Sequence, residues 1–516
     1  MTRRRAEPRC LALAIAACAM AAQAQDARLA VAAGQGGGTS IQPRLTVMET
    51  WTDNLTLSDR NKDAAIITTV SPGITIRSTG GAVRGTLDYS LNGIAYIKSD
   101  QPSRVQSSLS ASGQAELISR TLFVDMRASI GQQNASAFGL QSTPTLGSQG
   151  AISNLANSNQ HETGTLSVSP LLHGQLGGLA SFDLRGDFSR TEVRGSSLGD
   201  SRATGGSLVI NQLNGGLLAW WLRASTQEVK SSSAASNRSS TMTGGLNYRP
   251  DPDWFFTANA GRERNDFLGG SSQSGVTGGV TGQWTPTART RVNGDWQRHN
   301  YGNSHGLTFE HRMSRSVWRL SDTVSTMLGN TGATGGVRSN YDQFFLMFAS
   351  LEPDPVKRDV LVRAFLQAQG ISPDAPAALG FLSTGPSRLH SQLASITLQG
   401  ARTTLAAQVS RSVTSRLGSN LNQGDLANTA HVEQRSYSLT GSHQLTPSSS
   451  ASLTASRQET TGDAGTPSAR LTSLTANWNA RLGTRLNVML GGRHSRFAGT
   501  TSYSENAVYA NLTQLF

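Results

Sequence analysis

The sequence predicts an all-β protein: a closed antiparallel transmembrane β-barrel of about 22 strands (range about 16–22), with one short helical insertion in an outward loop. Three observations lead to this prediction. Apolar and polar residues alternate with a period of two over runs of about 10–14 residues. Short polar turns alternate with longer loops along the chain. The chain ends on AVYANLTQLF, a strand-like alternation with a terminal aromatic residue.

The alternating runs present one apolar face and one polar face. Clear examples are residues 83–91, 122–130, 180–188 and 486–493. A β-sandwich would also alternate, but its strands are usually about 5–6 residues long. A tilted strand needs about 9–11 residues to cross a bilayer, which the longer runs match.

The connections between runs fall into two classes. Turns at 78–81, 250–253, 285–288 and 482–484 are short, whereas loops at 132–161, 191–201, 229–239, 414–431 and 461–469 are long. Short turns at one end and long loops at the other are typical of outer-membrane barrels. We expect strands near 41–51, 63–78, 82–98, 105–117, 119–131, 162–174, 178–190, 202–212, 215–228, 240–249, 254–267, 274–285, 289–299, 305–313, 315–328, 388–399, 402–413, 432–444, 450–460, 470–481, 484–496 and 504–516.

The N-terminus has the composition of a secretory signal peptide. Basic residues precede the apolar run Cys10–Ala22, and the sequence Ala22-Gln23-Ala24 follows it. We therefore expect a signal peptide at 1–24, a periplasmic N-terminal segment at 25–40 and a barrel at 41–516. The alternative is a lipoprotein signal at 15–18. Because Cys10 and Cys18 both precede the expected cleavage site, disulfides and cysteine-based metal sites are excluded from the mature chain.

The C-terminal strand is expected to close the barrel. An unpaired backbone group in hydrocarbon costs several kcal/mol, so the last strand must pair with the first. One face of the final run carries Val508, Ala510, Leu512 and Phe516, which looks like the signal read by the outer-membrane barrel-assembly machinery. Gln514 departs from that pattern.

Aromatic residues gather near the expected strand ends, as in the girdles at membrane interfaces. The alternative is ordinary core packing. The residues concerned are Trp220, Trp221, Tyr248, Trp254, Trp284, Trp296, Trp478 and Tyr503.

Residues 329–387 interrupt the strand pattern and form the expected helical insertion. Asp354-Pro355 provides a helix start and Gly370 a stop. Val360, Leu361 and Phe365 belong to its apolar face and are candidates for a gate or plug. The alternative is a stabilising cap over the barrel rim.

Several stretches resemble the PEP-CTERM system-associated outer-membrane proteins. They are Thr52-Asp53-Asn54, Ser71-Pro72-Gly73-Ile74, the stretch 248–254 and FASLEPDPVKRDVLVRAFLQAQGISP at 348–373. The resemblance covers nearly the whole mature chain and is most specific in the helical insertion. It implies an outer-membrane barrel linked to exosortase and exopolysaccharide-synthesis systems, and it implies no catalytic residue.

The sequence carries no convincing enzymatic site, and we expect no cofactor and no bound metal. The nine histidines are scattered, and the six-residue separation of His305 and His311 matches no common zinc spacing. The pattern Gly195-Ser196-Ser197-Leu198-Gly199 resembles a nucleophile elbow, but no helix follows it. A chance match is expected in a chain so rich in Gly and Ser.

The chain is basic, with a formal net charge of +12, and removal of the four Arg and one Glu of the signal leaves +9. Export argues against a nucleic-acid partner as the reason, and the basic residues form no block. Many charges fall on the polar face, where they would line a wet, mildly anion-favouring lumen. The alternative is that opposite charges neutralise each other and stiffen the wall. The lumen-lining candidates are Arg84, Asp88, Asp125, Arg127, Asp183, Arg185, Asp187, Arg223, Arg291, Asp295, Arg485 and Arg493.

Three functions from different classes are compatible with these features. The first is a porin-like conduit in the bacterial outer membrane for an exopolysaccharide, gated by the insertion. The second is a surface scaffold that holds polymer or sorted proteins without transport, and the third is a barrel-borne enzyme, for which a site is lacking. The expected partners are outer-membrane lipids, the barrel-assembly machinery, exopolysaccharide and periplasmic export components.

Overall fold

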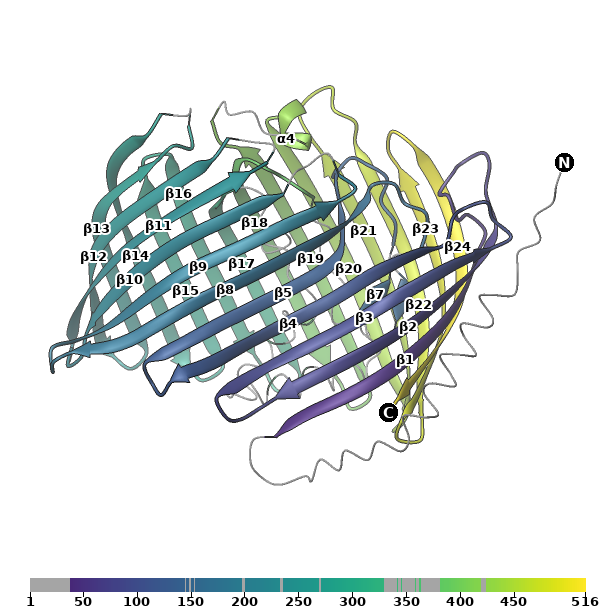
Figure 1. Ribbon diagram of the computed structural model, residues 1–516, viewed down its shortest axis with the longest axis horizontal. Coiled ribbons are helices and arrows are strands. Elements are labelled where there is room, and N and C mark those ends of the chain that lie inside the picture. The colour runs from purple at the N-terminus through teal and green to yellow at the C-terminus, as the bar shows by residue number, and fades with distance from the viewer. Residues whose placement is uncertain are drawn as a thin grey trace.

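The predicted barrel is confirmed by the computed structural model, which describes residues 38–143, 145–147, 150–152, 154–196, 200–232, 235–268, 271–328, 381–418 and 424–516, together with Tyr341, Phe345, Arg358 and Val362. Within this part of the chain, 22 strands form one antiparallel sheet that closes on itself (Figure 1). The strands named β1–β5 run across the front of the view, and the green strands β17–β20 cross behind them. Two short strands, β6 and β7, pair with each other outside this sheet.

Each of the 22 barrel strands follows the run that predicts it to within a few residues, whereas β6 and β7 lie in a stretch where no strand was predicted. The bounds are β1 Thr39–Thr52, β2 Ala65–Ser78, β3 Val83–Ile97, β4 Arg104–Ile118, β5 Leu122–Asn134, β6 Thr145–Gly147, β7 Gly150–Ile152, β8 Gln160–Leu176, β9 Ala180–Arg194, β10 Ser201–Gln212, β11 Leu218–Ser231, β12 Asn237–Asp251, β13 Trp254–Asn265, β14 Gln273–Thr287, β15 Thr290–His299, β16 Gly302–Arg312, β17 Ser316–Leu328, β18 Pro386–Gln399, β19 Thr403–Arg416, β20 His431–Thr446, β21 Ser449–Thr461, β22 Ala469–Leu482, β23 Leu486–Ala498 and β24 Ser502–Leu515.

The first and last strands of the barrel pair directly. β1 and β24 run antiparallel, with Arg44 opposite Leu515 at one end and Thr52 opposite Ala507 at the other. The N–H of the terminal Phe516 donates to the carbonyl of Pro43 at 3.0 Å. The strand-like end of the sequence therefore serves to remove the sheet's free edges, which hydrocarbon would not tolerate.

The connections lie at opposite ends of the barrel according to their length. Short turns join the strands at one end, hereafter the turn end, where Gly81, Gly177 and Gly483 adopt positive φ. That conformation is unfavourable for other residues. Longer connections, including 135–159, 329–385 and 417–430, lie at the other end, hereafter the loop end. The C-terminus lies at the turn end, opposite the short helix α4 (Figure 1).

The period-two alternation separates an outward apolar face from an inward polar face. In β24 the outward Val508 is 60% exposed, whereas the inward Asn511 and Thr513 are fully buried. In β23 the outward Leu490 is 46% exposed and the inward Arg493 is 4% exposed. Exposed apolar side chains continue around the outward face, as expected for a surface that contacts lipid.

Some of the aromatic residues form an outward cluster near the turn end. The ring of Trp254 stacks against Phe256 and Trp284, each with centroids 5.3 Å apart, and Tyr248 stacks against Phe256 at 6.5 Å. The girdle prediction is wrong for Trp221 and Tyr503, because strand alternation turns both side chains inward. Tyr503 is 3% exposed and packs beneath a loop.

Helical structure is scarce in the described part of the chain. Helix α4 spans Asp425–Asn428 in the connection between β19 and β20, where no helix was predicted. In the insertion 329–387, the described Tyr341, Phe345, Arg358 and Val362 have helical backbone, and Val362 is fully buried. Among the described residues, no helix is long and apolar enough to cross a bilayer. The expected gate residues Val360, Leu361 and Phe365, and the expected signal peptide 1–24, lie outside the described residues.

Candidate functional site

The connection between β5 and β8, residues 135–159, folds back over the inner face of the barrel and is called the inward loop below. Its described residues bond to inward side chains of five strands. The side-chain donors and the loop acceptors are Tyr96 Oη to Asn154 O (3.0 Å), Arg104 Nη2 to Leu155 O (2.7 Å), Arg493 Nη1 to Thr143 O (2.8 Å), Ser495 Oγ to Thr143 Oγ1 (3.0 Å) and Tyr503 Oη to Gln141 O (2.7 Å). In the other direction Asn154 Nδ2 donates to Thr50 Oγ1 at 3.1 Å. The loop thus occupies space that would otherwise belong to the lumen.

Apolar contacts hold the inward loop against the wall. Leu155 of the loop is 3% exposed and joins a buried cluster, against which Leu140 and Ala156 also pack. The wall and the neighbouring connection 53–64 contribute Leu55, Leu57, Ala65, Ile67, Ile94, Ala469, Leu471, Phe497 and Tyr503. Burial of apolar surface stabilises by about 25 cal/mol per Å², so this cluster favours the folded-in position of the loop.

A buried ion pair between β23 and β24 lies under the same loop. Arg493 Nη2 is 2.7 Å from Glu505 Oε1, and Arg493 Nε is 3.1 Å from Glu505 Oε2. The two side chains are 1% and 0% exposed. Thr52 Oγ1 also donates to Glu505 at 3.0 Å, which gives the carboxylate a further partner. Because Arg493 also donates to the Thr143 carbonyl, the pair connects the wall to the loop.

The loop end of the barrel is bridged by segments from three connections. Leu382, four residues before β18, donates its N–H to the carbonyl of Asn134 at the end of β5, at 3.2 Å. Asp425 of α4 accepts hydrogen bonds from Ser136 Oγ (2.7 Å) and from the Ala137 N–H (2.6 Å). Burial raises the pKa of the Asp425 carboxyl, and these two hydrogen bonds oppose that rise.

These bridges show that the barrel is flattened at its loop end. β5 and β18 are eleven strands apart in either direction around the 22-strand sheet. A circular barrel of that size, with strands about 4.8 Å apart and tilted by about 40°, would be about 44 Å across. The chain from Leu382 to Pro386 can span only about 14 Å. The ends of β5 and β18 therefore approach to within about 20 Å.

The part of the inner wall that the inward loop does not reach is rich in hydroxyl and amide groups. In β8, Thr163, Thr165, Ser167, Ser169 and Gln175 occupy inward positions. Similar groups alternate along the inward faces of β4, β12 and β14, at Gln106, Ser108, Ser110, Ser112, Gln114, Ser239, Thr241, Thr243, Asn247, Gln273, Thr277, Thr281 and Gln283. The exposed members of this set offer neutral donors and acceptors of hydrogen bonds, whereas Gln106, Thr163, Ser169, Thr243 and Thr277 are buried.

Several charges on the inner wall are arranged in pairs. Arg185 lies 2.9 Å from both Asp125 and Asp187, on strands β5 and β9. His173 Nδ1 is 2.7 Å from Asp183 Oδ1. Near the turn end Arg44 is 2.7 Å from Asp88. These charges are therefore locally neutralised.

The structure places the predicted lumen residues in three settings. Ten lie at inward positions: Arg84, Asp88, Asp125, Arg127, Asp183, Arg185, Asp187, Arg223, Arg291 and Asp295. Arg493 is also inward but is buried beneath the inward loop. Arg485 lies outside the strands, in the turn 483–485 at the turn end. Arg223 stands over the ring of Trp221 at 5.8 Å.

Sequence reasoning missed three residues of the inner wall. Arg44, Glu505 and Tyr503 all occupy polar-face positions of their alternating runs, and this parity was the signal available for Arg44 and Glu505. The proposed assembly-signal residues Val508, Ala510 and Leu512 lie on the outward face, and Phe516 is 44% exposed at the turn end.

No family description and no curated protein matches this chain. Among solved structures it is similar to the FrpB iron transporter from Neisseria meningitidis (F3-3 variant), with a TM-score of 0.49 and 11% identity, over 92% of this chain and 81% of that one. It is also similar to the siderophore receptor PirA from Pseudomonas aeruginosa, with a TM-score of 0.45 and 10% identity over 92% and 80% of the two chains. A third likeness is to the copper transporter OprC, with a TM-score of 0.38 and 9% identity over 94% and 81%.

Proposed function

We propose that this protein is integral to the bacterial outer membrane and forms a porin-like conduit for the export of a hydrophilic polymer. A closed sheet with an apolar outward face and a polar inward face is the arrangement that a strand-built membrane channel requires. On this proposal the turn end faces the periplasm and the loop end faces the outside of the cell, as the lengths of the connections suggest.

The observation that carries the proposal is the inward loop, which narrows the lumen from within and is tied to the wall by hydrogen bonds. A passive structural barrel has no need of a constriction held by a buried ion pair. In a conduit, such a loop would limit what passes, because pore diameter and the groups that line the pore determine selectivity. Bridges across the loop end add a second narrowing.

The lining favours a polysaccharide among hydrophilic polymers. Hydroxyl and amide side chains exchange hydrogen bonds with sugar hydroxyls, and the pairing of several inward charges weakens the field that an ionic cargo would meet. The resemblance to PEP-CTERM system-associated proteins points in the same direction, towards an exopolysaccharide delivered by periplasmic export components. The barrel-assembly machinery would insert the barrel by its C-terminal strand.

The proposal is tested by single-channel recording of the purified full chain in planar lipid bilayers. We expect discrete conductance that increases when residues 139–157 of the inward loop are replaced by a short Gly-Ser linker. Shortening the rim connection 232–236 is the matched control and should leave conductance unchanged. A neutral polysaccharide added to one side should reduce the current through the wild-type channel.

The second candidate function is a surface scaffold without transport, which is favoured by the bridging of the loop end by three connections. A scaffold predicts no conductance in the wild type and polymer binding that is lost when the loops are shortened. Deletion of residues 340–380 separates the two functions: a conduit should then conduct more, whereas a scaffold should only lose polymer. Absence of conductance in every variant would contradict the conduit.

A further inference from the structure

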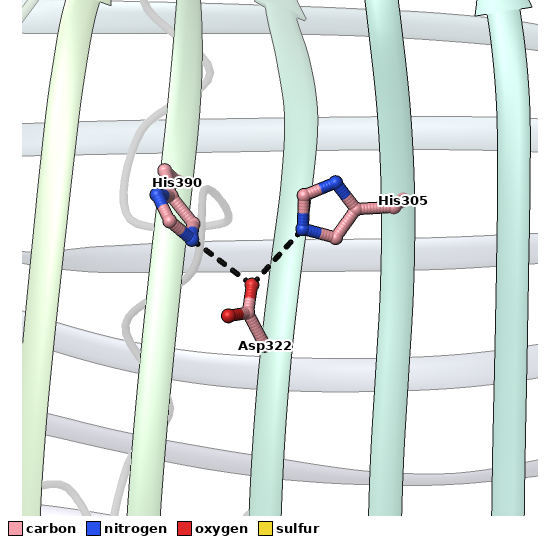
Figure 2. A group of neighbouring side chains, drawn as sticks. All are labelled: His305, Asp322 and His390. Carbon is pink, nitrogen blue, oxygen red and sulfur yellow. Dashed lines mark hydrogen bonds and ion pairs between the residues drawn. The ribbon is translucent and has the colours of Figure 1, made fainter.

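Three ionisable side chains meet on the outward face of the barrel, on the wall formed by β16, β17 and β18. Figure 2 shows His305 and His390 pointing from either side towards Asp322. His305 Nε2 is 3.1 Å and His390 Nε2 is 2.9 Å from the same oxygen, Asp322 Oδ1. One possible ligand atom from each of the three residues lies within 4.8 Å of the others. We refer to these residues as the outward trio.

The sheet register brings the outward trio together. Val324 of β17 lies directly opposite His305 of β16 on one side and opposite His390 of β18 on the other. Asp322 is two residues from Val324 and therefore shares its face, diagonally adjacent to both histidines. Diagonal neighbours of this kind are within reach of long side chains. No spacing within one strand could have revealed the trio, because it arises from three strands.

The outward trio lies at the edge of the apolar band nearer to the loop end. On β17 the outward residues towards the turn end are Leu320 and Trp318, which are 50% and 43% exposed. The side chains of His305, Asp322 and His390 are 43%, 36% and 32% exposed. They are therefore accessible from the level where lipid headgroups and water replace hydrocarbon.

We propose that the outward trio binds a divalent first-row transition metal ion, for which Zn²⁺ is the reference. Two imidazole nitrogens and one carboxylate oxygen form a donor set that suits Zn²⁺ and its neighbours rather than Mg²⁺ or Ca²⁺. Three protein ligands leave a fourth position open for water or another ligand. An ion would replace the protons through which the two imidazoles now contact Asp322.

Neighbouring side chains orient the carboxylate and weaken a competing charge. Gln392 Nε2 donates to Asp322 Oδ2 at 2.9 Å, which fixes the carboxylate and leaves Oδ1 for the histidines. Such outer contacts commonly orient metal ligands. Arg411, whose Nη1 is 3.3 Å from Gln392 Oε1, is paired through Nε with Glu433 at 2.8 Å. Arg411 is thus paired with a carboxylate, which reduces its repulsion of a metal ion. Arg388, two residues before His390 on the same face of β18, is exposed.

The other histidine–aspartate contacts of the described residues provide internal controls. His173 and Asp183 form a two-residue pair on the inward face at 2.7 Å, and His431 and Asp463 form another at 2.6 Å near the loop end. Within the described part of the chain, the outward trio alone combines three such groups closely enough to hold an ion. Two-residue pairs should bind zinc much more weakly.

The proposal is tested with the purified full chain in detergent micelles after treatment with a chelator. Titration calorimetry with ZnCl₂ should show one tight site per chain, and Co²⁺ should give the intense visible absorption of a four-coordinate complex. His305→Gln/His390→Gln should abolish both signals, and Asp322→Asn should weaken zinc binding at least about tenfold. His173→Gln should bind as the wild type does.

Folding of each variant is followed independently by resistance to unfolding in SDS, since Gln retains a hydrogen-bonding side chain at each histidine position. Equal zinc affinity and stoichiometry in the wild type and in a folded His305→Gln/His390→Gln variant would overturn the proposal. So would a wild-type chain that gives no four-coordinate Co²⁺ spectrum at saturating Co²⁺.

Discussion

Two parts of the inner wall share one sequence pattern but have different environments. On β1, β23 and β24, inward residues that contact the inward loop, such as Thr50, Arg493, Ser495 and Tyr503, are buried. On β9, β10 and β11, the inward positions in the middle of the strands remain half-buried or exposed. We refer to these as the covered wall and the open wall. A period of two thus decides which face is polar, whereas contact with a loop decides whether that face is accessible.

The covered wall is buried because its side chains are complementary to the inward loop that lies on it. Leu140 and Leu155 of the inward loop meet apolar residues of the wall, and the carbonyls of Gln141 and Thr143 meet Tyr503 and Arg493. On the open wall, Arg185 pairs with Asp125 and Asp187, and Arg223 is exposed. Substitutions should therefore have large effects on the covered wall and small effects on the open wall.

The largest effect is expected for Arg493→Ala on the covered wall. This change leaves Glu505 buried without its ionic partner, and breaking a buried pair typically costs about 3–5 kcal/mol. We expect a loss of that size in the free energy of unfolding, measured by denaturant titration of tryptophan fluorescence in micelles.

The matched control is Arg223→Ala on the open wall, where the side chain is exposed and stands over Trp221. Loss of an exposed cation–π contact should change the free energy of unfolding by less than about 1 kcal/mol. Equal destabilisation by the two substitutions would contradict the distinction between the walls.

An intermediate effect is expected for Tyr503→Phe, which removes the hydroxyl that donates to the Gln141 carbonyl at 2.7 Å. One buried hydrogen bond contributes about 0.5–1.5 kcal/mol, and the inward loop should become more sensitive to limited proteolysis. Tyr437→Phe, on an outward side chain that is 42% exposed, is the control. Unchanged proteolysis of the loop in Tyr503→Phe would show that this contact does not hold it.

Two contacts at the loop end should respond to pH in opposite senses. Burial raises the pKa of Asp425. The contribution of this carboxyl to the contact between α4 and the inward loop is therefore fully present below the ordinary Asp range, and it is lost as pH rises through the raised pKa. The Ala137 amide, which donates to Asp425, should gain protection from hydrogen exchange on acidification from neutral pH, after correction for intrinsic rates. Loss of protection over that range would contradict this sign.

Asp463 behaves in the opposite way. The N–H of Ala430 holds the pKa of Asp463 below its usual range, so its contribution is present above that range and is lost as pH falls through the lowered pKa. Protection of the Ala430 amide from hydrogen exchange should therefore persist from neutral pH down to about pH 4. Asp425, whose pKa is raised, should already be protonated at that pH. Earlier loss of this protection would contradict the lowered pKa.

The smallest effect on stability is expected for Asp187→Asn on the open wall. Asp187 pairs with Arg185, but its side chain is 49% exposed, and exposed pairs contribute about 0–1 kcal/mol. In planar bilayers, removal of one inward carboxylate should shift the reversal potential slightly towards anion selectivity. A shift towards cation selectivity would contradict an inward position for this residue.

The sequence was sufficient to predict the barrel, its strand count and the facing of most strands. In β23, for example, the alternation of Leu490 with Arg493 predicts the faces that the structure has. Pairing of the final strand with the first followed from the energetic penalty of a free edge in hydrocarbon.

The path of the inward loop could not be predicted, because residues 132–161 are rich in Gly, Ser and Asn and show no dominant periodicity. The outward trio was missed for another reason. His305, Asp322 and His390 are distant in sequence, and only the register of three strands brings them together. Pattern analysis within single strands cannot supply that register.

The most direct test of the covered wall is a disulfide between the inward loop and β23. Thr143 Oγ1 and Ser495 Oγ are 3.0 Å apart, so Thr143→Cys/Ser495→Cys should form a disulfide in the folded barrel, in a background with Cys10 and Cys18 replaced by Ala. Thr143→Cys/Ser225→Cys, which joins the loop to the open wall, should remain reduced. If the Thr143→Cys/Ser495→Cys variant stayed reduced, or if both variants cross-linked equally, that result would contradict a loop that lies on the inner face of β23.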